Sequence, residues 1–137
     1  YFDMEKDQLR QFIISYQLPK ELLHYHFELW HGPVAAKLIE DKFNITNEDV
    51  QNAIYYHTTG RANMSLIEVI IFVADYIEPG RKFPGVDAVR EDAKKDIYVA
   101  ARNAIKNTIH HLLNKDATIY PNTFLAYNDL TKSIGVK

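Results

Sequence analysis

Residues 57–61 carry side chains that could bind both a metal ion and a phosphate group, because they read His57-Thr58-Thr59-Gly60-Arg61. An imidazole is a common metal ligand, and hydroxyl and guanidinium groups donate hydrogen bonds to phosphate oxygens. Each residue also has an ordinary alternative, since threonines cap helix ends and a single histidine on a helix face is more often a core residue than a ligand. The string alone therefore indicates a candidate site and leaves both interpretations open.

A second candidate ligand, Asp75, lies near the end of a strongly apolar run, residues 65–77. Because a helix that is apolar on every side is usually buried, we expect this run to form a buried helix. Ser65 and Glu68 have the spacing of a capping box, which starts the helix at that point. A buried carboxylate is costly unless a cation or several hydrogen-bond donors meet it, so Asp75 is a candidate to face a metal ion.

His57 and Asp75 are expected to converge, because each lies at the end of a helix. Val50 and Ile54 lie on the expected buried face of a helix at residues 48–56. That face continues to His57 at helical spacing, so the imidazole should point into the core. The presence of Asp75 at a second helix end favours a ligand role for this histidine.

Two further positions could contribute to such a site. His31 precedes a predicted helix at residues 33–43 and stands next to Gly32, which lets another backbone come close. Taken alone, a histidine there is more often a packed or capping residue than a ligand. Arg81 lies in the loop after the apolar helix and could help to bind a phosphate, with ordinary surface charge as the alternative.

Apolar periodicity and helix-start signals predict an all-α fold. The expected helices cover, in chain order, residues 5–16, a short piece after Pro19, and residues 33–43, 48–56, 65–77, 87–94, 97–115 and 121–130. Thr46 and Asp49 have the spacing of a cap for the helix at 48–56. The remaining histidines are expected at the surface, at helix ends or in packing roles: His24, His26, His110 and His111.

Composition narrows the class of protein. The 137 residues suffice for one domain with a core, and 47% apolar and 25% charged residues are ordinary for a soluble globular protein. A net charge of −2 argues against a general nucleic-acid binder. The longest apolar run is shorter than the roughly 20 residues of a membrane span, and the absence of cysteine is compatible with the cytoplasm. Because the chain begins at Tyr1 without an initiator Met, we expect a fragment whose upstream part is missing.

Several strings together resemble the YqeK family of HD-domain proteins. They are Leu29-Trp30-His31-Gly32-Pro33-Val34, Tyr56-His57-Thr58-Thr59-Gly60-Arg61, Met64-Ser65-Leu66, Val73-Ala74-Asp75-Tyr76-Ile77-Glu78-Pro79, Phe83-Pro84-Gly85-Val86 and the weaker Ala126-Tyr127-Asn128. The resemblance implies an HD-domain helical bundle and the activity of bacterial hydrolases that split diadenosine tetraphosphate symmetrically into two ADP. It also implies a centre of two divalent metal ions, usually iron with manganese or cobalt as alternatives, and a cytoplasmic homodimer.

The resemblance assigns roles to individual residues. It makes His31, His57 and Asp75 metal ligands. From the chemistry of the side chains, we further predict catalytic roles for Arg61 and Asp75 and substrate contacts by Thr58, Thr59, Gly60, Arg61 and Arg81. The His-Asp doublet that names the superfamily occurs nowhere in the sequence, and Tyr1-Phe2-Asp3 resembles the segment just after it. Three further ligands are therefore expected upstream of Tyr1, so that residues 1–137 form a single HD-type domain truncated at its N-terminus. Tyr120 is a smaller departure, since relatives often have His before this Pro.

The sequence favours a metal-dependent phosphohydrolase that cuts a dinucleoside polyphosphate, with no nucleic-acid or membrane partner. One alternative is a degenerate HD domain that binds a nucleotide or phosphate without cutting it, and another is a helical interaction domain. Bound metal separates the interaction domain from the other two, and release of ADP separates the hydrolase from the degenerate domain. The fragment alone is expected to bind metal weakly, to be inactive and to self-associate through an uncovered apolar face.

Overall fold

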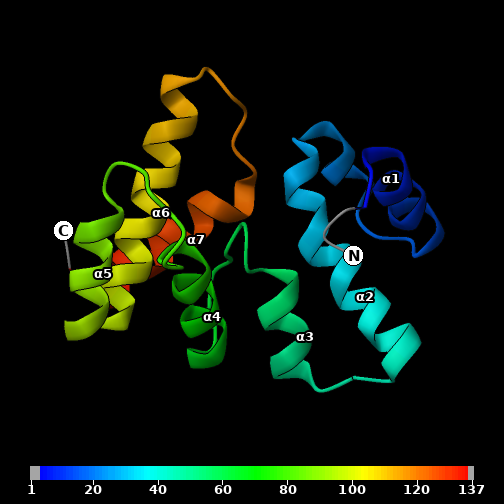
Figure 1. The fold of residues 1–137 in the computed structure, drawn as a ribbon, viewed down its shortest axis with the longest axis horizontal. Helices are drawn as coiled ribbons and strands as arrows, with labels where there is room; N and C mark the ends of the chain where they lie inside the picture. The colour runs from blue at the N-terminus through cyan, green and yellow to red at the C-terminus, as the bar shows by residue number, and fades with distance from the viewer. Residues whose placement is uncertain (1–3, 136–137) are drawn as a thin grey trace.

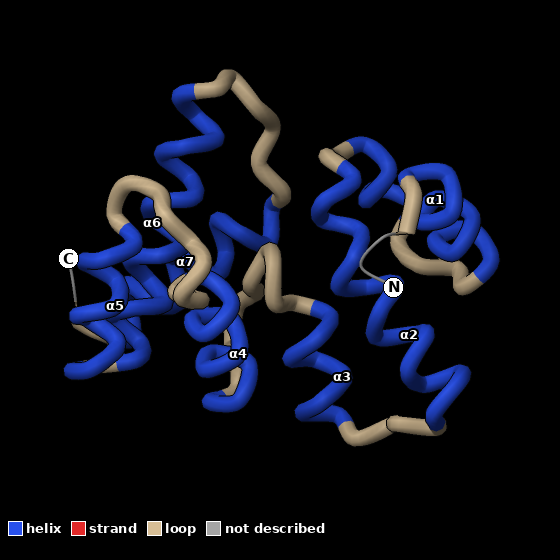
Figure 2. The backbone as a smooth tube through the Cα atoms, in the orientation of Figure 1, coloured by secondary structure: helices blue, strands red, loops and turns tan. Residues whose placement is uncertain are grey.

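The computed structural model describes residues 4–135, and helices joined by loops account for all of the regular structure in that range (Figures 1 and 2). The elements are α1 (Lys6–Ser15), the 3-10 helices η1 (Lys20–His24) and η2 (Phe27–Trp30), α2 (His31–Phe43), α3 (Glu48–Tyr55), α4 (Leu66–Tyr76), α5 (Val86–Lys95), α6 (Ile97–Asn114) and α7 (Pro121–Ser133). The all-α prediction is confirmed. The expectation about Tyr1-Phe2-Asp3 lies outside the described residues.

Two hydrophobic cores hold these helices together, and Figure 1 shows α1 and α2 on one side and α4 to α7 on the other, with α3 between them. The first core joins α1, the two 3-10 helices and α2 through Leu9, Ile13, Leu18, Leu22, Trp30, Val34, Leu38 and Tyr120. The second joins α4 to α7 through Val69, Phe72, Val73, Val89, Ala100, Ala101, Ala104, Ile105, Ile109, Ala126 and Leu130. α3 packs against both α2 and α4, so it connects the two halves.

The long helix α6 is the centre of the second core, because it contacts α4, α5 and α7. Its packing face carries three fully buried alanines, Ala100, Ala101 and Ala104. Small side chains let neighbouring helices approach closely, and the larger Ile105 and Ile109 fill the space one turn further on. These five buried side chains form the face of α6 that packs against the neighbouring helices.

Local signals define most helix ends. Ser65 accepts a hydrogen bond from the Glu68 backbone N–H, and the Glu68 side chain accepts one from the Ser65 backbone N–H, which confirms the capping box of α4. The cap predicted for α3 was wrong by one residue, because the Asn47 side chain accepts from the Val50 backbone N–H. Asparagine is as good a cap as threonine. Asn44, at φ 54°, ends α2 in the left-handed conformation that this residue type tolerates.

The prediction that α4 is buried on every side was wrong. Leu66 and Ile67 are 52% and 47% exposed, and Ile70 and Ile71 are 44% and 41% exposed. These four residues recur at helical spacing and form one apolar face of α4, because α3 and α6 cover only the opposite side. Val50 of α3, also predicted to be buried, is 40% exposed. Exposed apolar residues that gather on one helix face form a surface that another molecule or segment can cover.

Within residues 4–135, none of the helices combines the length and the apolar character that crossing a bilayer requires. The four histidines expected away from the site, His24, His26, His110 and His111, are all exposed in the structure. They differ in this respect from His31 and His57, whose side chains are partly buried.

Candidate metal and phosphate site

The start of α2 lies directly on the end of α3, and a glycine makes this contact possible. A Cβ atom added to Gly32 would stand 2.6 Å from the carbonyl oxygen of Tyr55 and 2.8 Å from that of Ile54. No residue with a side chain fits there without a shift of the backbone. His31 immediately precedes Gly32, and His57 follows the end of α3. The close approach predicted for Gly32 is confirmed, and it joins the two stretches that carry these histidines.

The imidazole of His57 is oriented by a backbone carbonyl of α3. Its Nδ1 atom lies 2.6 Å from the carbonyl oxygen of Ile54. Because a carbonyl oxygen only accepts hydrogen bonds, Nδ1 carries the proton, and in the neutral ring the lone pair is then on Nε2. Metal-bound histidines commonly have this arrangement, with one ring N–H donated to a carbonyl and the other nitrogen free for the metal. The geometry at His57 therefore fits a ligand role through Nε2.

Asp75 is on the last turn of α4 and is half-exposed, contrary to the prediction of a buried carboxylate. Its Oδ1 atom lies 3.4 Å from Nη2 of Arg81, and the two side chains are 45% and 46% exposed. An exposed ion pair of this kind contributes about 0–1 kcal/mol. A divalent cation could therefore replace Arg81 as the partner of Asp75 at little cost. The structure therefore brings Asp75 and Arg81 together, and the carboxylate of Asp75 is accessible to a metal ion.

The predicted ligands do not form a closed metal site by themselves. Among residues 4–135, no three His, Asp or Glu side chains lie close enough together to hold a metal ion. Three ligands are the usual minimum for a protein metal site with an open position. The ligand roles of His31, His57 and Asp75 therefore stay predictions, supported by the tautomer of His57 and the exposure of Asp75.

Arg61 makes a bidentate ion pair with Glu68. Its Nε and Nη2 atoms donate to the two carboxylate oxygens at 2.7 and 2.9 Å, and its guanidinium also lies over the ring of Tyr56, 4.8 Å from the centroid. Glu68 is only 2% exposed. A phosphate would have to bind Arg61 through Nη1 or replace Glu68. The phosphate role of Arg61 stays a prediction, whereas its role as the counter-ion of a buried carboxylate is observed.

The charge state of Glu68 follows from these contacts. Burial raises the pKa of this carboxyl group, but the hydrogen bonds from Arg61 and Ser65 outweigh burial and hold the pKa below its usual value. The same pair raises the pKa of Arg61. Sequence reasoning recognised Glu68 only as a capping residue. The missed signal was an arginine seven residues earlier, close enough in the chain to pair with it.

Thr58, Thr59 and Gly60 form the turn that follows His57. Thr59 is only 6% exposed, and its hydroxyl donates to the Gly60 carbonyl at 2.9 Å, while its own carbonyl accepts from Thr123 of α7 at 2.9 Å. Gly60 has a φ of 71° and packs against Ala126, so a side chain there would be strained. These contacts fix the turn on α7. A substrate contact stays a prediction for all three, and only Thr58 has a side chain that is partly exposed.

Tyr120, at the position where the resemblance leads one to expect His, is part of the first core. Burial, together with the charge of Glu21, raises the pKa of its hydroxyl to about 12. The ring packs edge-on against Tyr25 with centroids 5.0 Å apart. Tyr120 is therefore a neutral packing residue near neutral pH.

The class of protein is shown by a solved structure with the same arrangement of helices. The crystal structure of a predicted HD superfamily hydrolase involved in NAD metabolism from Clostridium acetobutylicum matches 95% of this chain and 69% of its own, with a TM-score of 0.87 and 38% identity. The fold is therefore that of an HD-domain hydrolase. No protein-family model matches the sequence.

Bacterial relatives narrow the class to a family. The chain is 46% identical over 123 residues to the symmetrical bis(5'-nucleosyl)-tetraphosphatase of Bacillus subtilis, covering 90% of this chain and 66% of the relative. It is 47% identical over 126 residues to the protein of the same name from Halalkalibacterium halodurans, covering 92% and 67%. The chain belongs to this family, the YqeK-type HD-domain tetraphosphatases. It spans about two thirds of the length of the curated relatives it matches.

Proposed function

We propose that the protein hydrolyses diadenosine tetraphosphate symmetrically into two molecules of ADP at a divalent-metal centre. The observation that carries this proposal is the identity of 46% and 47%, over 90% and 92% of this chain, to bacterial proteins named for a symmetrical tetraphosphatase activity. The resemblance adds the metal dependence, two ions per site and iron as the usual metal, and it further implies a cytoplasmic homodimer. Histidine and carboxylate ligands also suit manganese or cobalt.

The residues of this chain would have distinct tasks in the reaction. When bound, the metal ions would polarise phosphate oxygens and lower the pKa of a water molecule. His57 would hold a metal ion through Nε2, because its Nδ1 atom is bound to the Ile54 carbonyl. Asp75 would supply a carboxylate, and Arg81, released from Asp75, would be free to bind a phosphate oxygen of the substrate.

We propose that ligands outside the present sequence complete the site. His31, His57 and Asp75 are too few for a two-metal centre, and among residues 4–135 no other group of ligands is available. The relatives are longer than this chain by about a third of its length, since the 123 matched residues make up 66% of the first relative, and the resemblance places their His-Asp doublet outside the residues that match. The uncovered face of α4 is available to such a segment.

The products of the reaction test the proposal. The protein, extended to the length of its relatives, is incubated with diadenosine tetraphosphate and Fe²⁺, Mn²⁺ or Co²⁺, and the nucleotides are separated by ion-exchange chromatography. Symmetrical cleavage yields ADP alone, and formation of ATP with AMP would overturn the assignment. His57→Asn should abolish both bound metal and turnover, whereas the matched control His110→Asn, at an exposed histidine of α6, should change neither.

The names of the relatives favour the hydrolase over the alternative, a degenerate HD domain that binds a nucleotide without cutting it. Calorimetric binding of diadenosine tetraphosphate with no ADP formed, for a chain extended to the length of its relatives, would favour this alternative over the hydrolase.

A further inference from the structure

The connection between α3 and α4, residues 56–65, carries His57 and Arg61 but has no regular secondary structure of its own. Its backbone takes the left-handed conformation at Gly60, with φ 71°, and at Asn63, with φ 61°. An irregular segment of this kind keeps one arrangement only where neighbouring elements contact it. The position of His57 therefore depends on what holds the residues that follow it.

Two side chains of α7 form hydrogen bonds with the backbone of this connection. The hydroxyl of Thr123 donates to the carbonyl oxygen of Thr59 at 2.9 Å, and the carboxylate of Asp129 accepts from the backbone N–H of Asn63 at 2.9 Å. Thr123 is only 6% exposed, and a buried carbonyl oxygen without a donor is costly. The Thr123 hydroxyl therefore fixes the backbone two residues after His57.

A close packing contact lies between these two hydrogen bonds. A Cβ atom added to Gly60 would stand 3.1 Å from the Cβ atom of Ala126, so the backbone of the connection packs directly against α7. Thr123, Ala126 and Asp129 follow one another at intervals of three residues, which places them on one side of the helix. This side of α7 therefore contacts the connection at three successive points.

α7 is itself anchored in both hydrophobic cores. Tyr120, the residue that precedes its first turn, belongs to the first core together with Trp30, which is next to His31 in the sequence. Later residues of α7 belong to the second core together with Val73, two residues before Asp75. Since α7 also holds the connection between α3 and α4, it links the surroundings of all three predicted metal ligands.

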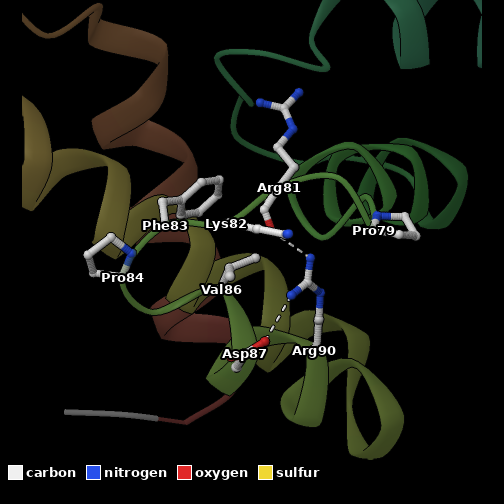
Figure 3. Close-up of a pocket in the computed structure, with 8 residues that line it drawn as sticks. All are labelled: Pro79, Arg81, Lys82, Phe83, Pro84, Val86, Asp87 and Arg90. Carbon is white, nitrogen blue, oxygen red and sulfur yellow. Dashed lines mark hydrogen bonds and ion pairs between the residues drawn. The ribbon is translucent and has the colours of Figure 1, made fainter.

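The chain after Asp75 is held by a different helix. Arg90 of α5 donates from Nη2 to the carbonyl oxygen of Glu78 at 3.0 Å and to that of Arg81 at 2.8 Å, and Figure 3 shows the second of these hydrogen bonds. These contacts act on the chain that follows α4, whereas those of α7 act on the chain that precedes it. Substitutions in α7 can therefore move His57 without loosening the loop after Asp75.

We propose that α7 sets the position of His57 for metal binding, with Thr123 as the positioning residue. Thr123 is not a ligand, because its hydroxyl donates to the Thr59 carbonyl and acts on His57 through the backbone. The hydrogen bond keeps the connection in the arrangement that binds metal, so that binding does not have to order it first. The inference rests on the proposed function and deepens it, because it names a residue that controls metal affinity from outside the ligand set.

Three substitutions in α7 test this role. Thr123→Val keeps about the same shape and removes the donor, so the affinity for Mn²⁺ should fall about tenfold, the order of effect of one hydrogen bond. Thr123→Ser keeps the hydroxyl and should bind Mn²⁺ as wild type does. Asp129→Ala removes the acceptor of the second hydrogen bond and should weaken Mn²⁺ about threefold, because water can replace part of this more exposed contact.

The matched control is Thr131→Val. Thr131 also lies on α7, and its buried hydroxyl has no hydrogen-bond partner among residues 4–135. The substitution makes the same chemical change as Thr123→Val on the same helix, but it removes no contact with the connection between α3 and α4. The Mn²⁺ affinity of this variant should therefore equal that of wild type.

The experiment uses the protein extended to the length of its relatives. Mn²⁺ binding is measured by calorimetry, and ADP release is measured with diadenosine tetraphosphate. Hydrogen exchange of the Gly60 amide, measured without metal, reports how firmly the connection is held, because this N–H donates to the Tyr56 carbonyl at 2.8 Å. Exchange should be about tenfold faster in Thr123→Val and unchanged in Thr131→Val. The amide of Ile105, in the core of α6, is the reference for a general loss of stability.

The outcomes separate this inference from the proposed function. Weaker Mn²⁺ binding and faster Gly60 exchange in Thr123→Val, both restored in Thr123→Ser, support the positioning role. Wild-type Mn²⁺ affinity in Thr123→Val overturns that role even if Gly60 exchanges faster, and ADP release then leaves the function standing. If Thr123→Val does not fold, wild-type affinity in Asp129→Ala overturns the role instead.

Two results for the wild type complete the test. If the wild type binds Mn²⁺ but forms no ADP, weaker binding in Thr123→Val supports the positioning role while the proposed function is overturned. If the wild type binds neither Mn²⁺ nor Fe²⁺, both the positioning role and the proposed function are overturned.

Discussion

Arg61→Ala should destabilise the protein whether or not Arg61 also binds phosphate. Glu68 is only 2% exposed, and Arg61 provides two of its hydrogen bonds, at 2.7 and 2.9 Å. The substitution leaves a buried carboxylate with only the donors of the Ser65 cap. Removing one partner of a buried ion pair typically costs about 3–5 kcal/mol, because the remaining charge is uncompensated.

The expected size of the effect can be measured by thermal unfolding. For a chain of this length, 1 kcal/mol corresponds to roughly 4 °C, so Arg61→Ala should melt at least about 10 °C below wild type. The double variant Arg61→Met/Glu68→Met should recover most of the loss, because no charge is then left buried. If the loss of stability in the double variant equals the sum of the losses in the two single variants, the side chains of Arg61 and Glu68 are not coupled.

The pH dependence has a definite sign. The folded-state pKa of Glu68 is lowered from its ordinary value of 4.5, so the pair contributes its full stability above that value. The contribution is lost as the pH falls through the lowered folded-state pKa, because the unfolded chain then binds the proton more readily. The difference in melting temperature between wild type and Arg61→Ala should therefore shrink in acid. If Arg61→Ala melts like wild type at pH 7 yet loses ADP release, the guanidinium acts on the substrate and not on Glu68.

Three further predictions concern the other parts of the site. Asp75→Asn should leave the melting temperature within a few degrees of wild type, since an exposed ion pair contributes at most about 1 kcal/mol. Elemental analysis should nevertheless find less bound metal in this variant. Unchanged metal content would show that Asp75 is not a ligand. Gly32→Ala should cost about 1–3 kcal/mol in denaturant unfolding, because its Cβ meets two backbone oxygens; wild-type stability would mean that the helices separate freely. Ile67→Glu should weaken concentration-dependent association in sedimentation experiments, whereas Leu113→Glu should not, although Leu113 of α6 is even more exposed, at 55% against 47%. Equal behaviour of the two variants would exclude the α4 face as the contact.

The sequence predicted those features that depend on neighbouring residues. The capping box at Ser65 and the all-α fold follow from local patterns, and both are confirmed. Gly32 was predicted to allow a close approach of another backbone, and the structure identifies that backbone as the end of α3. Proline at the first turn of α7 marks its start, although the helix continues three residues beyond the expected end.

The features that could not be predicted depend on what lies across space from a residue. An apolar run reports that a helix can be buried, but not which of its faces a neighbour covers, so four residues of α4 proved exposed. For the same reason Asp75 was expected to be buried and is not. A phosphate-binding role was predicted for Arg61 because it follows two threonine hydroxyls. In the structure its Nε and Nη2 atoms both donate to the carboxylate of Glu68.

The pair of Arg61 and Glu68 also has a consequence for the metal site that neither residue suggests alone. Arg61 ends the turn that begins at His57, and Glu68 lies on α4 two turns before Asp75. The pair therefore ties the stretch that carries one predicted ligand to the helix that carries another. Glu68→Gln keeps the shape of the side chain but removes the charge that holds Arg61, so it should lower metal affinity although residue 68 binds no metal. Metal affinity equal to wild type in a folded Glu68→Gln variant would show that the two ligands are positioned by other contacts.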